Sequence, residues 1–278
     1  MKLIVKTMAD WFQEGRSPEI LFWVGSAGSF DDRAKKITKS FVKIMNIAKV
    51  DFGVLGVEES ASGDVAKRAG NEFLFQMQAL MNIQLLNSYN IKRIVTTCPH
   101  DYNTIKNEYK GLGGKYEVLH HTEFIFELIK SNKLNLKYNS DEVALTYHDP
   151  CYLGRGNNIF KAPRKLLKTA GFNVVEMSRS KNKSFCCGAG GAQMFKEPEK
   201  GNQDININRT EEALKTLDYI NKNLHKQSNR KIKRKIIATS CPFCNTMMTD
   251  GVKNKNMESE VEVLDIVEII TEEKINSL

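Results

Sequence analysis

Cysteine is the residue type in this sequence whose number and spacing indicate chemistry. There are six cysteines, and all but Cys98 lie in the second half of the chain. The Cys-Pro-Phe-Cys segment alone suits a zinc ion, a redox dithiol or neither. Combined with a single upstream cysteine and an adjacent Cys-Cys pair, it predicts a metal or cluster site. The candidate ligands are Cys151, Cys186, Cys187, Cys241 and Cys244.

Five thiols exceed the four ligands that a tetrahedral zinc ion uses, whereas thiolates from several loops suit an iron–sulfur cluster. Two alternatives stay open at this stage. The first is a structural zinc ion held by Cys151, one cysteine of the adjacent pair, Cys241 and Cys244. The second is a cluster-free dithiol oxidoreductase that works through Cys241 and Cys244.

The elements that must position these cysteines alternate between strands and helices. Short apolar runs predict strands, and apolar residues spaced three and four apart predict helices. Their alternation favours an α/β fold with mainly parallel sheets flanked by helices. In the first half we expect strands at residues 20–24, 51–55, 92–98 and 116–120, and helices at 31–48, 65–88, 103–109 and 123–131. In the second half we expect strands at 143–147, 173–177, 235–239 and 261–264, and helices at 159–169, 208–223, 246–253 and 266–275.

The second half of the chain repeats the first. TTCPHDYNTI matches TSCPFCNTMM, and YEVLH matches VEVLD. An offset of 125 positions aligns the first two motif segments (151 − 26 and 186 − 61), and an offset of 143 aligns the third (241 − 98). The aligned residues are Ser26 with Cys151, Ala61 with Cys186, and Cys98 with Cys241. We therefore expect two tandem pseudo-repeated lobes, residues 1–139 and 140–278, with an insertion in the second.

Each cysteine of the second copy falls just after a predicted strand or in the loop that follows one. Ligands of parallel α/β sheets bind at the carboxyl ends of the strands. Three separate loops would therefore bring five thiols to one edge of one sheet.

With these motifs the chain resembles the cysteine-rich CCG domain, which occurs in duplicate in the B-type subunit of heterodisulfide reductase. Similar domains occur in the iron–sulfur subunits of glycolate oxidase, anaerobic glycerol-3-phosphate dehydrogenase and lactate-utilisation systems. The resemblance covers nearly the whole chain and is particularly close to the C-terminal CCG pair of large bacterial Fe-S oxidoreductases. It is carried by the segments WVGSAGSFDDRA, RAGNEFLFQM, TTCPH, YEVLHHTEF, HDPCYLGR, CCGAGGAQM and SCPFC.

The resemblance implies one noncubane [4Fe-4S] cluster in the second lobe, and it implies an iron–sulfur electron-transfer subunit of an oxidoreductase complex. The implied ligands are Cys151, Cys186, Cys187, Cys241 and Cys244. Implied partners are a ferredoxin-type Fe-S subunit or a flavin subunit, through which the chain could associate peripherally with a membrane. Disulfide cleavage in heterodisulfide reductases involves two clusters, so we expect single-cluster electron transfer here and assign no catalytic residue.

The first copy departs from the family pattern. Ser26, Ala61 and Asp101 stand where close relatives have cysteines, and position 62 is a serine. Serine and aspartate oxygens are harder and weaker iron ligands than thiolates, and alanine offers no ligand atom. We expect that the first lobe binds no cluster and is a structural or docking half, with Cys98 as a buried thiol.

Three histidines lie beside these motifs. His148 immediately precedes the Asp-Pro-Cys segment, so it could hydrogen-bond a ligand or shuttle a proton. The alternative is a histidine at the end of a strand whose hydrogen bonds are made to local backbone. His120 and His121 lie at a strand-to-helix junction of the first copy, where a structural role is expected.

The net charge of +8 comes almost entirely from one segment. Residues 222–235 carry seven Lys and Arg and no acidic residue, so the rest of the chain is close to neutral. This segment lacks the aromatic or recognition residues of a nucleic-acid site, and no nucleic acid is expected as a partner. It suits an acidic partner, an anionic lipid surface or a solvated loop.

The apolar segments are too short for a membrane span or a signal peptide. We therefore expect a cytoplasmic protein, in which thiols are kept reduced.

Overall fold

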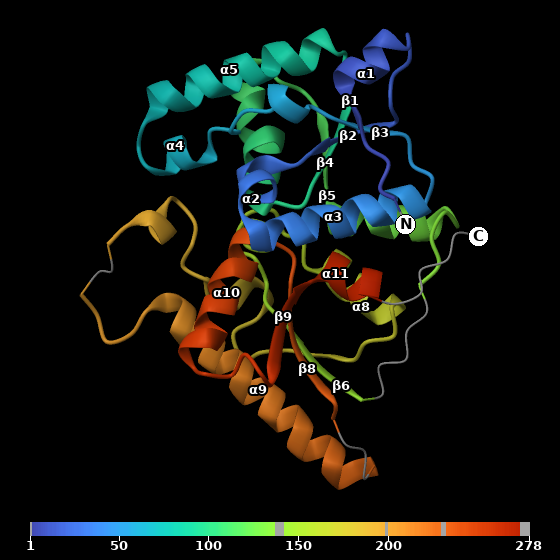
Figure 1. Ribbon diagram of the computed structural model, residues 1–278. Helices are drawn as coiled ribbons and strands as arrows, with labels where there is room; N and C mark the ends of the chain where they lie inside the picture. Colours follow the sequence, from blue (N-terminus) through green and yellow to red (C-terminus); the bar gives the residue numbers. More distant parts are fainter. Residues whose placement is uncertain (1, 137–141, 198–199, 229–231, 273–278) are drawn as a thin grey trace.

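Two parallel β-sheets form the framework of the computed structural model, which describes residues 2–136, 142–197, 200–228 and 232–272 (Figure 1). The first sheet has the order β1-β3-β2-β4-β5 and the second the order β7-β6-β8-β9. The spatial strand order β3-β2-β4-β5 of the first sheet matches the order β7-β6-β8-β9 of the second sheet, strand for strand. This correspondence confirms the α/β fold with two pseudo-repeated lobes. The strands are β1 Lys6–Thr7, β2 Ile20–Trp23, β3 Phe52–Val54, β4 Arg93–Thr96, β5 Glu117–His120, β6 Val143–Tyr147, β7 Val174–Val175, β8 Arg234–Thr239 and β9 Val261–Asp265.

Helices cover both faces of each sheet. Figure 1 shows α5 at the top over the first sheet, α3 running between the two sheets, and α9 and α10 against the second sheet. The helices of the first lobe are α1 Met8–Gln13, α2 Gly25–Phe30, α3 Asp32–Ile47, α4 Asp64–Arg68, α5 Glu72–Ser88, α6 Pro99–Asn103 and α7 His121–Lys130. Those of the second lobe are α8 Lys161–Thr169, α9 Ile205–Ser228, α10 Pro242–Asn254 and α11 Ile266–Glu272. Short 3₁₀ or π turns lie at Gly56–Glu58, Thr104–Glu108, Tyr109–Leu112, Lys181–Lys183 and Gln193–Phe195.

The central strands are buried on both faces because successive side chains point to opposite sides of a sheet. In β2, Ile20 and Phe22 face the core that lies between the two sheets, whereas Leu21 and Trp23 face the outer core beneath α5. Apolar side chains from α3, α7, α8 and α11 share the central core. The two lobes therefore pack around one common hydrophobic core and have an outer core each.

Polar contacts also join the lobes across this core. Arg33 in α3 makes a paired contact with Glu268 in α11, with both nitrogen–oxygen distances at 2.7 Å. Lys43 in the same helix donates to the backbone carbonyl of Thr271 at 3.0 Å. The expected boundary between residues 139 and 140 lies outside the described residues.

The helix expected at 65–88 is two helices, α4 and α5. Gly70 has a φ of +84° and ends the first helix, and the Asn71 side chain caps the second by accepting from the Leu74 N–H at 3.0 Å. A residue with left-handed backbone followed by an N-cap residue ends one helix and begins another. The spacing of apolar residues does not reveal such a break. The prediction of one long helix was wrong for this reason.

The helices expected at 103–109 and 246–253 begin earlier, at Pro99 and Pro242. Proline is well placed in the first turn of a helix because its φ is preset and its missing N–H has no partner there. Both prolines directly follow a cysteine of the motif. Elements that the sequence did not predict are β1, α1 and α2.

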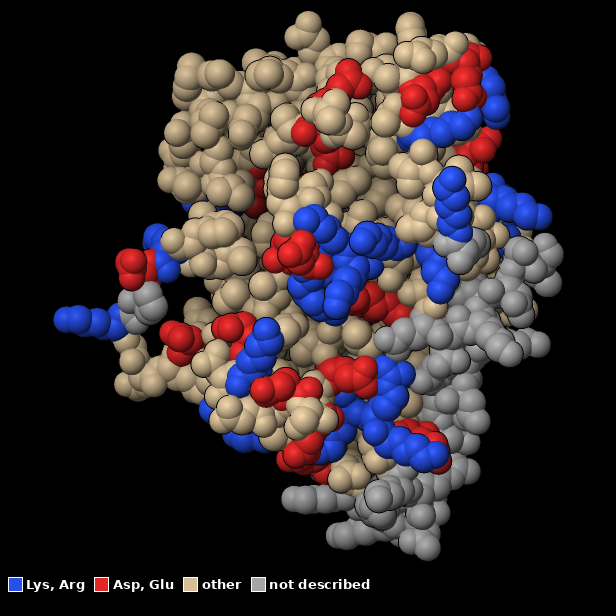
Figure 2. Space-filling model, viewed as in Figure 1, with Lys and Arg blue, Asp and Glu red and all other residues tan. Residues whose placement is uncertain are grey.

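The charged surface is uneven. Figure 2 shows Lys, Arg, Asp and Glu intermixed over the second lobe, whereas the part over α4 and α5 has few charged groups in this view. The large apolar side chains exposed on α5 are Phe73, Leu74, Met77, Leu80 and Met81.

Much of the basic segment 222–235 continues α9 and begins β8. Its side chains from 222 to 231 lie outside the described residues. Lys233, Arg234 and Lys235 form ion pairs with the acidic residues Glu142, Glu262 and Glu260. A neighbouring carboxylate therefore partly balances the charge of each of these three cations.

Candidate metal centre

The same strand-to-helix turn places a cysteine in both lobes. β4 leads to Cys98 and β8 leads to Cys241, and each is the N-cap residue of the helix that follows. Each thiol therefore lies at the carboxyl end of a central strand. Cys244 lies three residues further along α10, on the same helix face as Cys241.

The other three cysteines lie on loops after β6 and β7. The loop of the Cys186-Cys187 pair turns at Gly188, which has a φ of +90° and whose N–H donates to the Cys186 Sγ at 3.3 Å. The loop of Cys151 directly follows the strand end occupied by His148. As expected, the carboxyl edge of the second sheet collects the chain segments that carry the thiols.

All five thiols of the second lobe form one contiguous group. Side-chain hydrogen bonds link Cys151 with Cys186, Cys186 with Cys187, Cys187 with Cys244, and Cys244 with Cys241. Cys187, Cys241 and Cys244 are buried, while Cys151 and Cys186 are half-buried. The group is therefore anchored in the interior and reaches the surface at one end.

These contacts give the thiols opposite proton affinities. Hydrogen bonds from the thiols of Cys151 and Cys187 lower the pKa of Cys186 strongly, with a further contribution from the Gly188 N–H. The same contacts raise the pKa of Cys151 and of Cys187, because a second thiolate would lie beside the first. The sulfurs can all ionise together only if cations compensate their charge. A donor set of this kind fits one or more thiophilic metal ions, whose binding displaces thiol protons.

Apolar side chains surround the thiol group. Ala189 is buried among the cysteines, and Met194, Phe243 and Met247 pack against them. Such surroundings lower the local dielectric and limit the access of water, which tunes the potential of a redox centre.

His148 lies beside this group and is fully buried. One of its ring nitrogens lies within 4.8 Å of the sulfurs of Cys187 and Cys244. Its Nδ1 accepts a hydrogen bond from the Nε of Arg209 at 3.0 Å. Burial and the neighbouring Arg209 cation lower the pKa of His148 to about 3, so the ring is neutral at physiological pH.

Asp149 holds the backbone next to the centre. Both of its oxygens accept from Arg164 at 2.8 Å, and one also accepts from the Lys181 N–H at 2.8 Å. This carboxylate thus ties the loop of Cys151 to the segment that precedes the Cys186-Cys187 pair.

Cys98 is buried near the thiol group without being part of the hydrogen-bonded series. Its thiol interacts with the carboxylate of Asp101, and burial is the main cause that raises its pKa. The charge of Cys241, in the other lobe, contributes more weakly in the same direction.

Comparison with known proteins decides the family. The profile of the CCG family, described as a cysteine-rich domain, matches residues 20–106 and 145–249. The two matches cover most of the chain and correspond to the two lobes. The chain belongs to the CCG cysteine-rich domain family.

Curated relatives are longer than this chain. A Bacillus subtilis protein described as a probable iron-sulfur-binding oxidoreductase, FadF, is 44% identical over 96% of the chain and 36% of its own length. The EtfAB:quinone oxidoreductase of Syntrophomonas wolfei is 40% identical over 93% of the chain and 35% of its own length. One of the subunits of the dihydromethanophenazine:CoB--CoM heterodisulfide reductase of Methanosarcina barkeri is 29% identical over 91% of the chain and 58% of its own length. The chain thus spans about a third of the first two relatives.

The first CCG copy has a cavity where its aligned cysteines are missing. The cavity has a volume of about 400 Å³, and its walls include Ser26, Ala61, Ser62 and Asp101. Ser62 donates to Asp101 at 2.5 Å, and burial raises the pKa of this carboxyl to about 6. The second CCG copy contributes Phe243 to the same wall. The replaced positions therefore lie together, beside the cysteine centre of the other copy.

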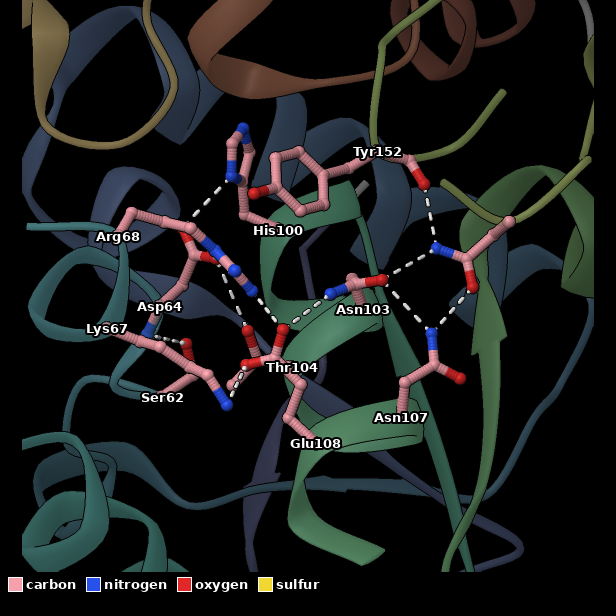
Figure 3. Close-up of polar contacts among 11 residues, drawn as sticks. Ser62, Asp64, Lys67, Arg68, His100, Asn103, Thr104, Asn107, Glu108 and Tyr152 are labelled. Atoms are coloured by element: carbon pink, nitrogen blue, oxygen red, sulfur yellow. Dashed lines mark hydrogen bonds and ion pairs between the residues drawn. The ribbon is translucent and has the colours of Figure 1, made fainter. Parts of the chain in front are cut away.

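A polar network joins the first CCG copy to the loop that begins at Cys151 (Figure 3). His100 donates from Nδ1 to the Asp64 carboxylate at 3.0 Å, and its ring lies 4.4 Å from that of Tyr152, centroid to centroid. Asn107 donates to Asn157 at 2.8 Å. The first copy thus contacts the residues that follow Cys151 from two directions.

His120 and His121 also make structural contacts at the lobe boundary. His120 pairs through Nδ1 with Thr122 at 2.8 Å and through Nε2 with the Ser240 carbonyl at 3.1 Å. His121 is fully buried and lies 3.3 Å from an oxygen of Asp265. Burial lowers the pKa of both histidines, to about 3 for His121.

Sequence reasoning missed Arg209 and His100. Arg209 is a fully buried cation in α9 whose Nε donates to the His148 ring beside the centre. In the sequence, nothing distinguishes Arg209 from the other polar residues of a predicted helix. His100 follows the proline of the first T-x-C-P turn, so the alignment of that turn with the one at Cys241 could have indicated its location.

In the described part of the chain, no helix combines the length and apolar character that crossing a bilayer requires.

Proposed function

We propose that the second CCG copy holds an iron–sulfur cluster and that the chain transfers electrons within an oxidoreductase complex. The contiguous group of five thiols carries this proposal, because it exceeds the donor set of a tetrahedral zinc ion. The printed names of the relatives support it, since one is described as iron-sulfur-binding and others as oxidoreductases or subunits of them.

The cluster that we propose is one [4Fe-4S] cluster of the noncubane type, which the family resemblance implies. Such a cluster supplies one-electron redox chemistry when it is bound. The chain holds the thiolates from three loops, surrounds them with apolar side chains and leaves two of them half-buried, where electrons can enter and leave. The proposed ligands are Cys151, Cys186, Cys187, Cys241 and Cys244.

We assign the two CCG copies to residues 1–139 and 140–278 and propose that the first binds no cluster. The side chains of Ser26, Ala61, Ser62 and Asp101 occupy the positions where the second copy has cysteines. Cys98 is the one cysteine of the first copy. The polar network of Figure 3 supports a structural role for this copy, because it holds the loop that begins at Cys151.

A ferredoxin-type Fe-S or flavin-containing subunit or domain is the proposed electron partner. The relatives have additional chain that could supply it, and one is named for the reaction of EtfAB with quinone. Contact with a membrane would come through such a partner, on the cytoplasmic side. The ion pairs of Lys233, Arg234 and Lys235 give no support to a nucleic-acid partner.

Metal analysis of anaerobically purified protein tests the proposal. We expect a brown protein with iron and acid-labile sulfide in equal amounts, and an EPR signal that depends on the redox state. A colourless protein loaded with zinc would contradict it.

Structural zinc is the second candidate, and the approach of His148 to Cys187 and Cys244 favours it. Zinc in the purified protein and no acid-labile sulfide would support this candidate. A dithiol enzyme would instead keep a redox couple after complete removal of metal, and Cys241→Ser alone would abolish it.

A further inference from the structure

His148 is held rigidly at the edge of the thiol group. It directly follows β6, and its backbone N–H donates to the Ala238 carbonyl at 2.9 Å. Its side chain has no exposed surface, and one ring nitrogen lies within 4.8 Å of the sulfurs of Cys187 and Cys244. The ring therefore has a fixed place beside two of the proposed ligands.

Arg209 determines which nitrogen of this ring carries the proton. The guanidinium Nε is always a donor, and it lies 3.0 Å from Nδ1 of His148. Nδ1 must therefore offer its lone pair. A neutral imidazole has one N–H, so that proton is on Nε2.

The guanidinium itself is held by the protein. Its Nη1 donates to the Arg179 carbonyl and to Glu212, both at 2.9 Å. Arg209 is completely buried in α9. These contacts fix its orientation, and with it the tautomer of His148.

Nε2 of His148 is buried and has no hydrogen-bond partner among the described residues. Buried N–H groups normally have a partner, and an unpaired one is costly. The sulfurs of Cys187 and Cys244 lie within 4.8 Å of one ring nitrogen of His148 but make no hydrogen bond to Nε2 themselves, so a sulfur bound at the thiol group would supply the missing acceptor.

We propose that His148 is not a ligand of the cluster but donates a hydrogen bond from Nε2 to one of its sulfurs, in a tautomer that Arg209 fixes. This inference rests on the proposed iron–sulfur function. Coordination through Nε2 would require a ring with both lone pairs engaged and no proton, an imidazolate. A doubly protonated ring would point an N–H at the N–H of Arg209.

The expected consequence is a higher reduction potential. A hydrogen bond to a sulfur stabilises the added negative charge of the reduced cluster, and such bonds are among the factors that set cluster potentials. The buried Arg209 cation acts in the same direction. His148 is then a positioning and tuning residue that carries no electron itself.

The test uses the anaerobically purified chain with its cluster and ¹⁵N-labelled histidine. Electron–nuclear double resonance of the paramagnetic state should show a weakly coupled ¹⁵N and an exchangeable proton, both absent from His148→Phe. Redox titration should give a lower midpoint potential for His148→Phe, partly restored in His148→Gln, whose amide can still donate. His121→Phe removes another buried histidine and should leave the potential unchanged.

A strongly coupled ¹⁵N that disappears in His148→Gln would make His148 an iron ligand and overturn the inference. A midpoint potential that is the same in wild type and His148→Phe would also overturn it. If His148→Phe does not fold, the strength of the ¹⁵N coupling in the wild type still distinguishes a hydrogen-bond donor from an iron ligand. A chain that binds zinc and no iron would refute the proposed function and this inference together, and metal analysis would identify that case.

Discussion

At the residue scale, equivalent positions of the two lobes carry different chemistry. The second lobe gathers thiols, whereas the first presents oxygen atoms at the places of Ser26, Ser62 and Asp101. Burial raises the pKa of Asp101 to about 6 and that of nearby Glu59 to about 7. The first lobe therefore contains carboxyl groups that are partly protonated near neutral pH.

Glu59 should make the protein less stable as the pH rises. Its folded-state pKa is about 7 against an ordinary value of 4.5, so the folded state retains a proton that the unfolded state has lost between these pH values. The stability contribution is fully present below pH 4.5 and is lost as the pH rises through 7. Glu59→Gln should remove about 2–3 kcal/mol of the pH dependence between pH 5 and pH 8.

Urea denaturation at pH 5 and pH 8 measures the effect. The wild type should lose more stability than Glu59→Gln over this interval, with Glu58→Gln, an exposed neighbour, behaving as the wild type. Equal losses in wild type and Glu59→Gln would show that Glu59 ionises normally in the folded state.

The sequence predicted which cysteines gather but not what surrounds them. Motif spacing and the expected strand ends were enough to place the five thiols at one sheet edge. The contacts of Arg209 with His148 and of His120 with Ser240 join segments far apart in the sequence. Such contacts depend on how helices and lobes pack, which periodicity does not encode.

At the element scale, short turns decide where helices begin and end. Proline after Cys98 and Cys241 starts α6 and α10 directly at the thiols. Gly70 divides the segment that apolar periodicity predicted as one helix, because its left-handed backbone cannot belong to either helix. Strand positions were predicted well, since buried parallel strands are short continuous apolar runs.

Gly70→Ala should destabilise the protein by about 1 kcal/mol. The φ of Gly70 is +84°, which is unfavourable for an L side chain, and nothing lies within 4 Å of the added Cβ. Gly111→Ala is the matched control because its Cβ also meets open space while its φ is not left-handed. Thermal unfolding should separate the two variants, and a stable Gly70→Ala would mean that the chain reversal tolerates a side chain.

At the scale of the whole molecule, the two lobes share a core, so they should unfold together. Side chains of α3 and α7 pack with those of α8 and α11 between the sheets. The internal repeat of the sequence predicted two copies, and the common strand order confirms them. How the copies pack could not be predicted, because each sheet could bury its inner face in several ways.

Arg33→Ala should cost about 2 kcal/mol and should lower the stability of both lobes. Arg33 and Glu268 are largely buried and make a paired contact. Removing the Arg33 guanidinium leaves the Glu268 carboxylate without its cationic partner. Lys35→Ala removes an exposed pair with Asp32 in the same helix and should cost less than about 0.5 kcal/mol. Two separate transitions in the wild type, with Arg33→Ala affecting one of them, would contradict a shared core.

The central claim is that the second lobe alone holds the cluster, through its five contiguous thiols. Its most direct test is the iron and acid-labile sulfide content of Cys187→Ser beside that of Cys98→Ser, both purified anaerobically. Cys187 lies in the middle of the thiol group, whereas Cys98 lies outside its hydrogen-bonded series. The account predicts that Cys187→Ser loses most of the iron and sulfide while Cys98→Ser retains the wild-type content. Loss of iron from Cys98→Ser, or its full retention by Cys187→Ser, would contradict the account.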